Sequence, residues 1–404
     1  MDTLFVVSRT SDCPFDVSGG RVISEDAYLS DPEYRRCPGF KVFNLCSSYD
    51  YQSRGYYVSL LAEARGHRPV PDIKAIEGMR TPPTDNITLA NLVEQKPNGD
   101  LPARRPRVAI LLTPDQPPYP SSAPAIQKFI TAADRLGMDA EIITSADAHR
   151  LHEFDGLFIR DTTRIHHYTY DIARQAASAG MVVIDDPDSI LRCTNKAFLA
   201  EIFLRYGIPT PRTMLIHAGN VAEVIPTLGL PCVLKRPDGA FSAGVVRVNT
   251  EQDLYAKVQS LLHDSAIVVG QEYLPTTFDW RVGVLEGRAI FACKYYMAAG
   301  HWQIIKYRKD AVTCEGAAEA CSIGEVPDMV IKRALQAASL IGNGLYGVDL
   351  KQIDDRVYVI EINDNPNVDV GNEDAVLKDA LYRDVMGVFR KRIEARKVGV
   401  NEQA

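Results

Sequence analysis

Several features that mark whole classes of protein are missing from this sequence of 404 residues. No apolar run reaches the about 18–20 residues that a membrane-spanning helix needs. The N-terminus, MDTLFVVSRTSD, lacks the basic region and long apolar stretch of a secretory signal. The eight cysteines include no Cys-x-x-Cys pair and mostly lie in apolar runs, which favours buried, reduced thiols over a disulfide framework or a zinc site. We therefore expect a cytoplasmic protein with no membrane partner.

An excess of positive charge is also missing. Lys and Arg total 45 against 52 Asp and Glu, so the formal net charge is -7. A protein that binds nucleic acid over a large surface carries a basic patch, so we expect no nucleic acid partner. Apolar residues make up 46% and charged residues 24%, which is typical of a folded protein. At about 150 residues per domain, the length predicts two or three domains.

Familiar catalytic motifs are missing as well. The sequence contains neither the Gly-x-Ser-x-Gly motif of hydrolases nor a Walker A motif, and no cysteine has a motif around it that marks a nucleophile. Residues 342–347 (GNGLYG) match the glycine pattern of dinucleotide-binding folds. They follow a predicted helix and open a predicted strand, however, which is the reverse of the order that NAD binding requires. We interpret them as a turn at the end of a helix.

Composition and periodicity divide the chain into four segments, at 1–95, 96–106, 107–190 and 191–396. The first begins with an apolar strand at 4–7 and includes a helix over 56–66, while the second is a linker rich in Pro, Gly and charge. The third alternates short apolar strands with amphipathic helices, which predicts a parallel sheet covered by helices. The fourth opens with a helix that Thr194 would cap and continues with hairpins and helices, which predicts antiparallel sheet. The expected fold class is α/β followed by α+β.

The sharpest chemical signal is a predicted hairpin with strands at 346–353 and 357–362. Glu361 and Asn363 are two residues apart and therefore share one strand face. A three-residue turn would place Asp349 directly opposite Glu361, whereas a two-residue turn would put them on opposite faces. Three oxygen ligands on one face suit Mg²⁺, which shares its coordination shell with phosphate and water. An ordinary solvated hairpin face would show the same alternation, so both interpretations stay open.

A second signal lies at 234–246. Lys235 closes an apolar strand there, and small residues that include Gly239 and Ser242 follow. Small residues let backbone N–H groups approach phosphate oxygens, and the lysine supplies a point charge. A plain hairpin loop that ends in a solvated lysine is the alternative.

A third signal is the run Gln271-Glu272-Tyr273-Leu274, followed by Asp279, Arg281 and Lys294. A strand that ends in this way can present its backbone to a purine and its carboxylate to a ribose. The two cations can bind phosphates or a substrate carboxylate. A surface charge pair beside a hairpin would look the same.

The order of these features resembles the ATP-grasp superfamily. The residues that carry the resemblance are Lys196, Lys235, the 271–274 run, Asp279-x-Arg281, Lys294, Asp349 and Glu361-Ile362-Asn363. The ending GVDL…VIEINDNPN is similar to RimK-type ligases, and residues 107–190 are similar to the pre-ATP-grasp domain of that branch. Residues 44–67 resemble the extra N-terminal domain of some RimK-like proteins. The resemblance covers nearly the whole chain and implies a pre-ATP-grasp parallel-sheet domain, an ATP-grasp domain of antiparallel sheets and helices, and an additional N-terminal α/β region.

The resemblance also implies an activity, the joining of a carboxylate to an amine at the expense of ATP. ATP would phosphorylate the carboxylate, and the amine would attack the acylphosphate, leaving ADP, phosphate and an amide bond. The substrates would be an amino acid such as glutamate and a small molecule, peptide or carrier protein, and the assembly a dimer or tetramer.

Site residues follow from the same resemblance. It implies ATP binding by Lys196, Lys235, Gly239, Ser242, Glu272, Tyr273, Leu274, Asp279 and Gln303. It implies binding of Mg²⁺ or Mn²⁺ by Asp349, Glu361 and Asn363, and stabilisation of the acylphosphate by Arg281 and Lys294. Gln303 falls where RimK-type relatives often place an arginine, and would act as a neutral hydrogen-bond donor. We also expect substrate contacts from Arg160, Thr162 and Asn365, Arg160 because it follows a strand end where α/β sheets commonly bind ligands.

Two other functions stay compatible with the sequence. An ATP-grasp fold can serve a phosphotransferase or a thioester-forming ligase, which would show no dependence on an amine. A non-enzymatic ATP-binding scaffold would be expected to lose phosphate or metal residues. Lys235, Asp349, Glu361 and Asn363 are all present, which favours catalysis.

Overall fold

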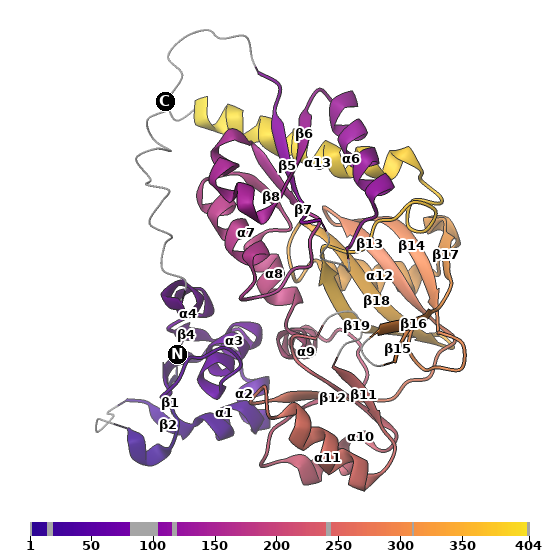
Figure 1. Cartoon of the computed structure of the whole chain (residues 1–404). Coiled ribbons are helices and arrows are strands. Elements are labelled where there is room, and N and C mark those ends of the chain that lie inside the picture. Colours follow the sequence, from indigo (N-terminus) through magenta and orange to yellow (C-terminus); the bar gives the residue numbers. More distant parts are fainter. Residues whose placement is uncertain are drawn as a thin grey trace. The chain divides into compact units, whose positions relative to one another are not determined.

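A computed structural model describes residues 2–13, 19–80, 104–114, 119–239, 244–308 and 311–401. The chain forms two compact units, each built from two separate stretches (Figure 1). Unit 1 comprises residues 1–84 and 195–275, and unit 2 comprises residues 85–194 and 276–404. Residues 96–103 of the predicted linker at 96–106 lie outside the described residues. Within the described ranges, no helix is both long and apolar enough to cross a membrane.

The N-terminal part of unit 1 is a four-stranded parallel sheet in the order β2-β1-β3-β4. Its elements are β1 (Thr3–Val7), η1 (Thr10–Asp12), β2 (Arg21–Ser24), α1 (Glu25–Ser30), α2 (Pro32–Arg36), β3 (Lys41–Leu45), α3 (Arg54–Arg65), β4 (Arg68–Val70) and α4 (Ile73–Arg80). The strand expected at 4–7 and the helix expected at 56–66 are both present as β1 and α3. The expected α/β character of this region is therefore confirmed.

Helix α3 is the central helix of this region. Ser53 caps it by accepting a hydrogen bond from the Tyr56 amide at 3.2 Å, and Gly66 ends it in the left-handed conformation with φ 76°. The left-handed backbone angle at position 66 favours glycine, and the end of the flexible Arg205 side chain packs close against it. Ten of the twelve residues of α3 are buried, which explains why its apolar residues run almost all the way round.

The second part of unit 1 is an antiparallel sheet in the order β11-β10-β12-β9. Its elements are α9 (Lys196–Arg205), β9 (Thr213–Ile216), η3 (Val221–Glu223), α10 (Val224–Leu228), β10 (Cys232–Lys235), β11 (Val245–Val248), α11 (Glu251–Leu261) and β12 (Val268–Glu272). Asn195 caps α9 through hydrogen bonds from the amides of Ala197 and Phe198. The expectation that Thr194 is the cap was wrong, because Thr194 ends the preceding helix.

Unit 2 begins with a second parallel sheet, in the order β6-β5-β7-β8. Its elements are β5 (Arg107–Leu111), α6 (Ala123–Arg135), β6 (Asp139–Ile143), η2 (Ser145–Glu153), β7 (Gly156–Ile159), α7 (Tyr168–Ser178), β8 (Val182–Ile184) and α8 (Pro187–Cys193). Every strand predicted for 107–190 is present. Phe129 of α6 packs edge-to-face on Phe158 of β7 at 4.9 Å, as its buried helical spacing predicts.

The rest of unit 2 is a five-stranded antiparallel sheet in the order β17-β14-β13-β18-β19, with the separate hairpin β15-β16. Its elements are β13 (Phe278–Leu285), β14 (Arg288–Tyr296), β15 (Ile305–Arg308), β16 (Ala311–Glu315), β17 (Ala318–Cys321), η4 (Ile323–Glu325), α12 (Asp328–Ala338), β18 (Leu345–Ile353), β19 (Arg356–Asp364) and α13 (Asp379–Asn401). Helix α13 packs on α6, and its Phe389 completes the aromatic core with Phe158. The eight cysteines, all of them in described residues, form no disulfide, and five are buried.

Candidate active site

The predicted metal hairpin is formed by β18 and β19. The turn has two residues, with Ile353 opposite Arg356, which by itself would separate Asp349 from Glu361. A β-bulge between Asp349 and Leu350 inserts one extra residue on β19 and restores the register, so that Asp349 lies directly opposite Glu361. The two carboxylates therefore share one face, as the sequence predicted, but through a bulge and not through a three-residue turn.

Two side chains donate hydrogen bonds to Asp349 on this face. Arg281 of the neighbouring strand β13 binds it with two parallel hydrogen bonds of 2.7 Å, from Nε to Oδ1 and from Nη2 to Oδ2. Asn363 donates from Nδ2 to Asp349 Oδ2 at 3.0 Å, so its Oδ1 is the atom that can ligate a cation. Burial lowers the pKa of Arg281, but the nearby carboxylate of Asp349 has a larger, opposite effect. The pKa of Arg281 is therefore raised well above its ordinary value.

The predicted residue Asp279 lies on the same face, two residues before Arg281. Its Oδ1 accepts hydrogen bonds from Thr276 Oγ1 at 2.7 Å and from Lys351 Nζ at 2.6 Å. Lys351 was missed by the sequence analysis, although its position two residues after Asp349 on β18 placed it on this face. Tyr295, whose ring lies 5.1 Å from the Arg281 guanidinium, was also missed, because its neighbourhood depends on the β13–β14 pairing.

Lys294 does not join this group. It pairs with Trp280 across β13 and β14, and Trp280 points to the opposite face of the sheet from Arg281. The Lys294 ammonium lies 5.6 Å from the Trp280 ring and 3.0 Å from Glu319 Oε1. The expected joint action of Arg281 and Lys294 therefore has no geometric support. Gln303 lies in the coil before β15, where its Oε1 is 3.3 Å from His301 Nε2.

The face around Asp349 fits a hard divalent cation. Its donors are two carboxylates and one amide oxygen, and Mg²⁺ favours such a partial protein shell because it retains water and binds phosphates. No cluster of three or more His, Cys, Asp or Glu side chains suited to a metal occurs in the described part of the chain. The candidate site therefore combines the two carboxylates with the amide oxygen of Asn363.

The predicted phosphate-binding residues lie in unit 1. Lys235 is the last residue of β10 and is buried. Lys196 begins α9, and its backbone amide donates to the Pro237 carbonyl at 2.7 Å while its Nζ donates to the Gly239 carbonyl. These bonds bring Lys196 to the loop that follows Lys235. Ser242 lies outside the described residues.

The predicted adenine and ribose residues lie at the end of β12. Glu272 is its last residue, and Arg212 donates to both carboxylate oxygens, from its backbone amide at 2.8 Å and from Nε at 2.7 Å. The Tyr273 ring lies 5.3 Å from the Arg247 guanidinium, and Leu274 follows in coil. Glu272 is therefore held by a neighbouring arginine, which fixes the strand end.

Arg160 has surroundings that differ from the expected substrate contact. It is fully buried, and it donates to Asn365 Oδ1, to Ser121 Oγ and to the carbonyls of Pro120 and Pro366 at 2.7–2.9 Å. Asn365 also donates from Nδ2 to the Asp161 carbonyl and from its backbone to Asp185 Oδ2. This geometry favours a positioning role for Arg160, since its hydrogen bonds hold the chain directly after Asn363.

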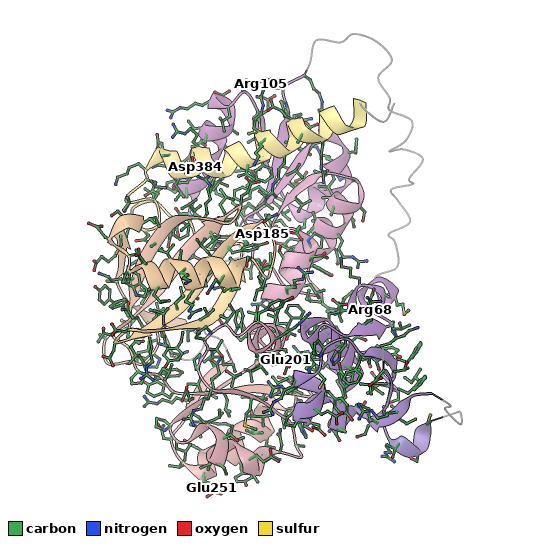
Figure 2. All side chains as sticks on the ribbon, turned by 180° about the vertical axis from the view of Figure 1, so that it is seen from behind. Arg68, Arg105, Asp185, Glu201, Glu251 and Asp384 are labelled. Carbon is green, nitrogen blue, oxygen red and sulfur yellow. The ribbon has the colours of Figure 1, made fainter. Side chains whose placement is uncertain are left out.

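Asn365 and Thr162, which were also predicted to contact substrate, form hydrogen bonds within the protein. Asn365 is buried and adopts the left-handed φ of 50°, which asparagine tolerates better than most residues. Thr162 is half-buried and accepts a hydrogen bond at its carbonyl from Thr169 at 3.3 Å. Asp185, whose carboxylate caps the amides of Leu345 and Asn365, is fully buried, and burial raises its pKa to about 8 (Figure 2).

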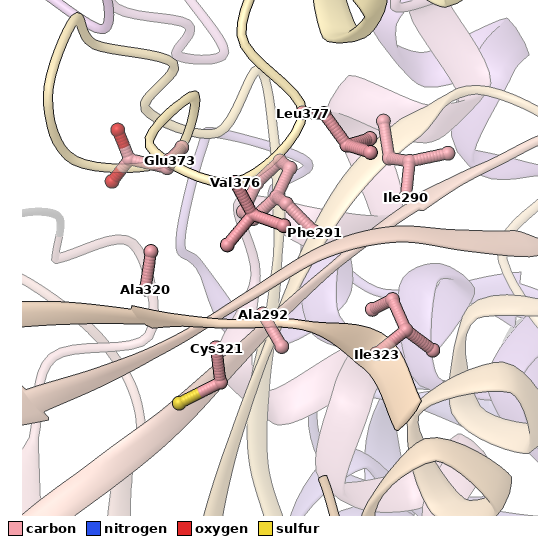
Figure 3. Close-up of a pocket in the computed structure, with 9 residues that line it drawn as sticks. All are labelled: Ile290, Phe291, Ala292, Ala320, Cys321, Ile323, Glu373, Val376 and Leu377. Carbon is pink, nitrogen blue, oxygen red and sulfur yellow. The ribbon is translucent and has the colours of Figure 1, made fainter. Parts of the chain in front are cut away.

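A small pocket in unit 2 lies apart from the predicted residues. Figure 3 shows apolar side chains around it, with Glu373 at one side. Its lining residues are Ile290, Phe291, Ala292, Ala320, Cys321, Ile323, Glu373, Val376 and Leu377. Glu373 is occupied by hydrogen bonds from the Tyr295 hydroxyl and the Asp369 amide. The pocket offers no free charge for binding a phosphate, and none of the predicted site residues lines it.

Comparison with known proteins gives two family matches. Residues 25–105 match the RimK-like ATPgrasp N-terminal domain, and residues 193–378 match the RimK-like ATP-grasp domain. The chain is 26% identical over 248 residues to a probable alpha-L-glutamate ligase of Vibrio vulnificus, covering 60% of this chain and 77% of that protein. It is 27% identical over 252 residues to a probable alpha-L-glutamate ligase of Teredinibacter turnerae, covering 61% and 79%.

Solved structures share the fold. The D-alanine–D-alanine ligase of Bacillus anthracis matches with a TM-score of 0.55 at 17% identity, over 72% of this chain and 99% of that one. A RimK domain ATP-grasp protein of Sphaerobacter thermophilus matches with a TM-score of 0.52 at 16% identity, over 70% and 98%. The expected fold class is thus confirmed. The chain thus carries a RimK-like ATPgrasp N-terminal domain followed by a RimK-like ATP-grasp domain.

Proposed function

We propose that this protein is an ATP-dependent carboxylate–amine ligase that forms an amide bond through an acylphosphate. The observation that carries the proposal is the face formed by Arg281, Asp349, Glu361 and Asn363, where oxygen ligands for a cation stand beside a permanent positive charge. A carboxylate oxygen of the substrate attacks the γ-phosphorus of ATP and ADP leaves. The amine then attacks the acyl carbon, phosphate leaves, and the amine gives up a proton.

The chain contributes positioning and charge to these steps. Lys196 and Lys235, in the nucleotide lobe (residues 195–275), bind ATP phosphates, and the backbone of 272–274 binds adenine. Arg281 stabilises the negative charge that develops on the transferred phosphoryl group. Asp349, Glu361 and Asn363 would hold Mg²⁺ or Mn²⁺, which neutralises phosphate charge when bound.

The relatives support glutamate as the amino acid that is added, since they are named probable alpha-L-glutamate ligases. The second substrate is then a carboxylate on a small molecule, a peptide or a carrier protein. The ATP complex known for the D-alanine–D-alanine ligase of Bacillus anthracis supports ATP as the nucleotide. We further propose that the segments 1–95, 107–190 and 191–396 act as N-terminal, pre-ATP-grasp and ATP-grasp domains, and that the protein forms a dimer or tetramer.

The test is a phosphate-release assay with ATP, Mg²⁺ and a pool of amino acids, followed by mass spectrometry of the mixture. A ligase yields ADP, phosphate and a product heavier by one amino-acid residue. Glu361→Gln should lower this activity by about 10²-fold or more, as expected when a charge-stabilising group is lost. Asp354→Asn is the matched control, because it makes the same kind of change at the exposed turn of the same hairpin and should leave activity within about twofold. ATP turnover without a condensed product would favour a phosphotransferase.

A further inference from the structure

The N-terminal region (residues 2–80) and the nucleotide lobe belong to one compact unit. Within unit 1, helices α2 and α3 of the N-terminal region pack on α9 of the lobe. Three of the contacts between the two parts involve elements of the lobe that carry residues to which we assign ATP. The positions of these contacts therefore indicate the role of the N-terminal region.

The first contact holds helix α9, which begins with Lys196. Arg65 of α3 donates from Nε to Glu201 Oε2 of α9 at 3.1 Å, and Arg35 lies 2.9 Å from Glu201 Oε1. The side chains of Arg65 and Glu201 are each only 1% exposed. Arg65 also donates to the carbonyls of Tyr28 and Leu29, so the charge pair is fully enclosed and fixes α9 to the N-terminal sheet region.

The second contact holds the segment that leads into β12. The Ala266 amide donates to the Gln52 carbonyl at 3.0 Å, and the Tyr57 hydroxyl is 2.9 Å from Ser265 Oγ. Tyr57 is completely buried, and Gln52 is buried in a left-handed conformation with φ 63°. Strand β12 begins two residues later and ends in Glu272, so these bonds anchor the strand that carries the adenine-binding backbone.

The third contact reaches the loop after Lys235. The Tyr51 hydroxyl donates to Asp238 Oδ2 at 3.4 Å, and Arg236 donates to Asp238 Oδ1 at 3.4 Å. Burial and the nearby Asp238 charge raise the pKa of Tyr51, so the hydroxyl keeps its proton and acts as the donor. Gly239, whose carbonyl accepts from Lys196 Nζ, is the next residue of this loop.

We propose that the N-terminal region is a brace for the nucleotide lobe, and that Tyr51 is a positioning residue that fixes the Asp238 end of the phosphate-binding loop for ATP. This inference rests on the proposed function, because it takes Lys196, Lys235 and the 272–274 backbone as ATP ligands. Tyr56 and Tyr57 offer no surface to a substrate, because both are buried. Tyr56 and Tyr57 are 1% and 0% exposed, and the Tyr51 ring packs edge-to-face on Tyr56 at 5.2 Å.

The experiment compares the full-length Tyr51→Phe, Asp238→Asn and Tyr49→Phe variants. Tyr49→Phe is the matched control, because the Tyr49 hydroxyl donates to the Asn44 carbonyl within the N-terminal region. ATP with Mg²⁺ and no amine is titrated by calorimetry, and kcat and KM for ATP are measured in the ligase assay. We expect Tyr51→Phe and Asp238→Asn to weaken ATP binding and raise KM fivefold or more, with kcat within twofold of the unaltered chain. The double variant should be no weaker than the Asp238→Asn variant, because in this account Tyr51 acts on the loop through Asp238, whose carboxylate also binds Arg236.

Two results would overturn the inference. One is a Tyr51→Phe protein that binds ATP as tightly as Tyr49→Phe, and the other is a loss of kcat at unchanged KM, which would indicate a general structural effect. The proposed function fails separately. If the unaltered chain binds ATP but joins no amino acid to any acid, the ligase proposal is wrong, while the ratio of affinities between the variants still tests the brace.

Discussion

Arg281 donates two hydrogen bonds of 2.7 Å to Asp349 on the adjacent strand, so its guanidinium is paired directly with a candidate metal ligand. Their side chains are 18% and 15% exposed, and the raised pKa of Arg281 keeps it charged. The planar, permanently charged guanidinium of an arginine can hold a carboxylate in one orientation through two hydrogen bonds. The ammonium group of a flexible lysine cannot do so. The pair therefore both orients Asp349 and places positive charge where phosphoryl transfer would need it.

Replacing Arg281 tests this dual role. Arg281→Gln removes the guanidinium and its charge, and should lower kcat by about 10²–10³-fold, the usual cost of losing one preorganised stabilising group. Arg281→Lys should recover only part of the loss, because it restores charge without bidentate binding. Arg288→Gln, an exposed change on β14 of the same sheet, is the control for steady-state kinetics. Turnover of Arg281→Gln within twofold of the unaltered chain would refute the role.

Removing Arg160 should destabilise unit 2. Arg160→Gln leaves buried acceptors, among them the Pro120 and Pro366 carbonyls, without their donor, at about 1–3 kcal/mol for each. We expect a loss of about 3 kcal/mol or more in unfolding free energy from urea titration, together with a lower kcat. Arg164→Gln, an exposed change in the same segment, should alter neither. A rise in KM for the acid at unchanged stability would instead return Arg160 to substrate binding.

Replacing one partner of the buried Arg65–Glu201 pair should lower the free energy of unfolding. Arg65→Met leaves the buried Glu201 carboxylate with Arg35 as its remaining cation and removes the donor of the Tyr28 and Leu29 carbonyls. It should therefore cost about 3 kcal/mol, the lower end of the range for one-sided loss of a buried pair. Arg21→Met breaks the Arg21–Glu33 pair, whose side chains are 48% and 46% exposed, and should cost about 0–1 kcal/mol. Urea midpoints of the two variants measure the contrast. Equal midpoints would mean that the buried pair adds nothing to the stability of unit 1.

Acid should weaken unit 1 through His67. Its Nε2 donates to the Cys37 carbonyl at 2.9 Å, so its Nδ1 accepts from Tyr28. Burial lowers the pKa of His67 from 6.5 to about 4. Between these two pH values, His67 is protonated in the unfolded chain but not in the folded chain. His67 therefore contributes about 3 kcal/mol to the free energy of unfolding above pH 6.5, and this contribution is lost as the pH falls to about 4.

His67→Gln tests this pH dependence, because glutamine can make both hydrogen bonds without titrating. Its stability should change less than that of the unaltered chain between pH 6.5 and 4, measured by urea unfolding at each pH. His149→Gln, an exposed change, should keep the original profile. A His67→Gln profile parallel to the original would show that other groups cause the acid sensitivity.

Strong local signals made most of the fold predictable from the sequence. The helical spacing of Ile126 and Phe129 and the glycine stop at Gly66 predicted α6 and α3. Strands β2 and β4 were missed because they have only four and three residues, and β4 contains Pro69. Such short strands are specified by their parallel neighbours more than by their own pattern.

Only those features of the site that follow from the alternation of side chains along a single strand could be predicted from the sequence. The Asp349–Glu361 pairing depends on a bulge, which a count of turn residues does not reveal. The separation of Lys294 from Arg281 depends on the register of β13 and β14, and sequence order alone carried no information about it. Arg160 was expected to contact substrate, since nothing nearby in sequence showed that it would be fully buried and hydrogen-bonded to Asn365.

The central claim, an acylphosphate made from ATP, is tested most directly by isotope transfer. The acid identified in the condensation assay is labelled with ¹⁸O in its carboxylate and incubated with ATP, Mg²⁺ and the amine, and the released phosphate is analysed by mass spectrometry. The account predicts one ¹⁸O in each phosphate released, and no labelled phosphate above background from Glu361→Gln. Amide product accompanied by unlabelled phosphate would contradict it.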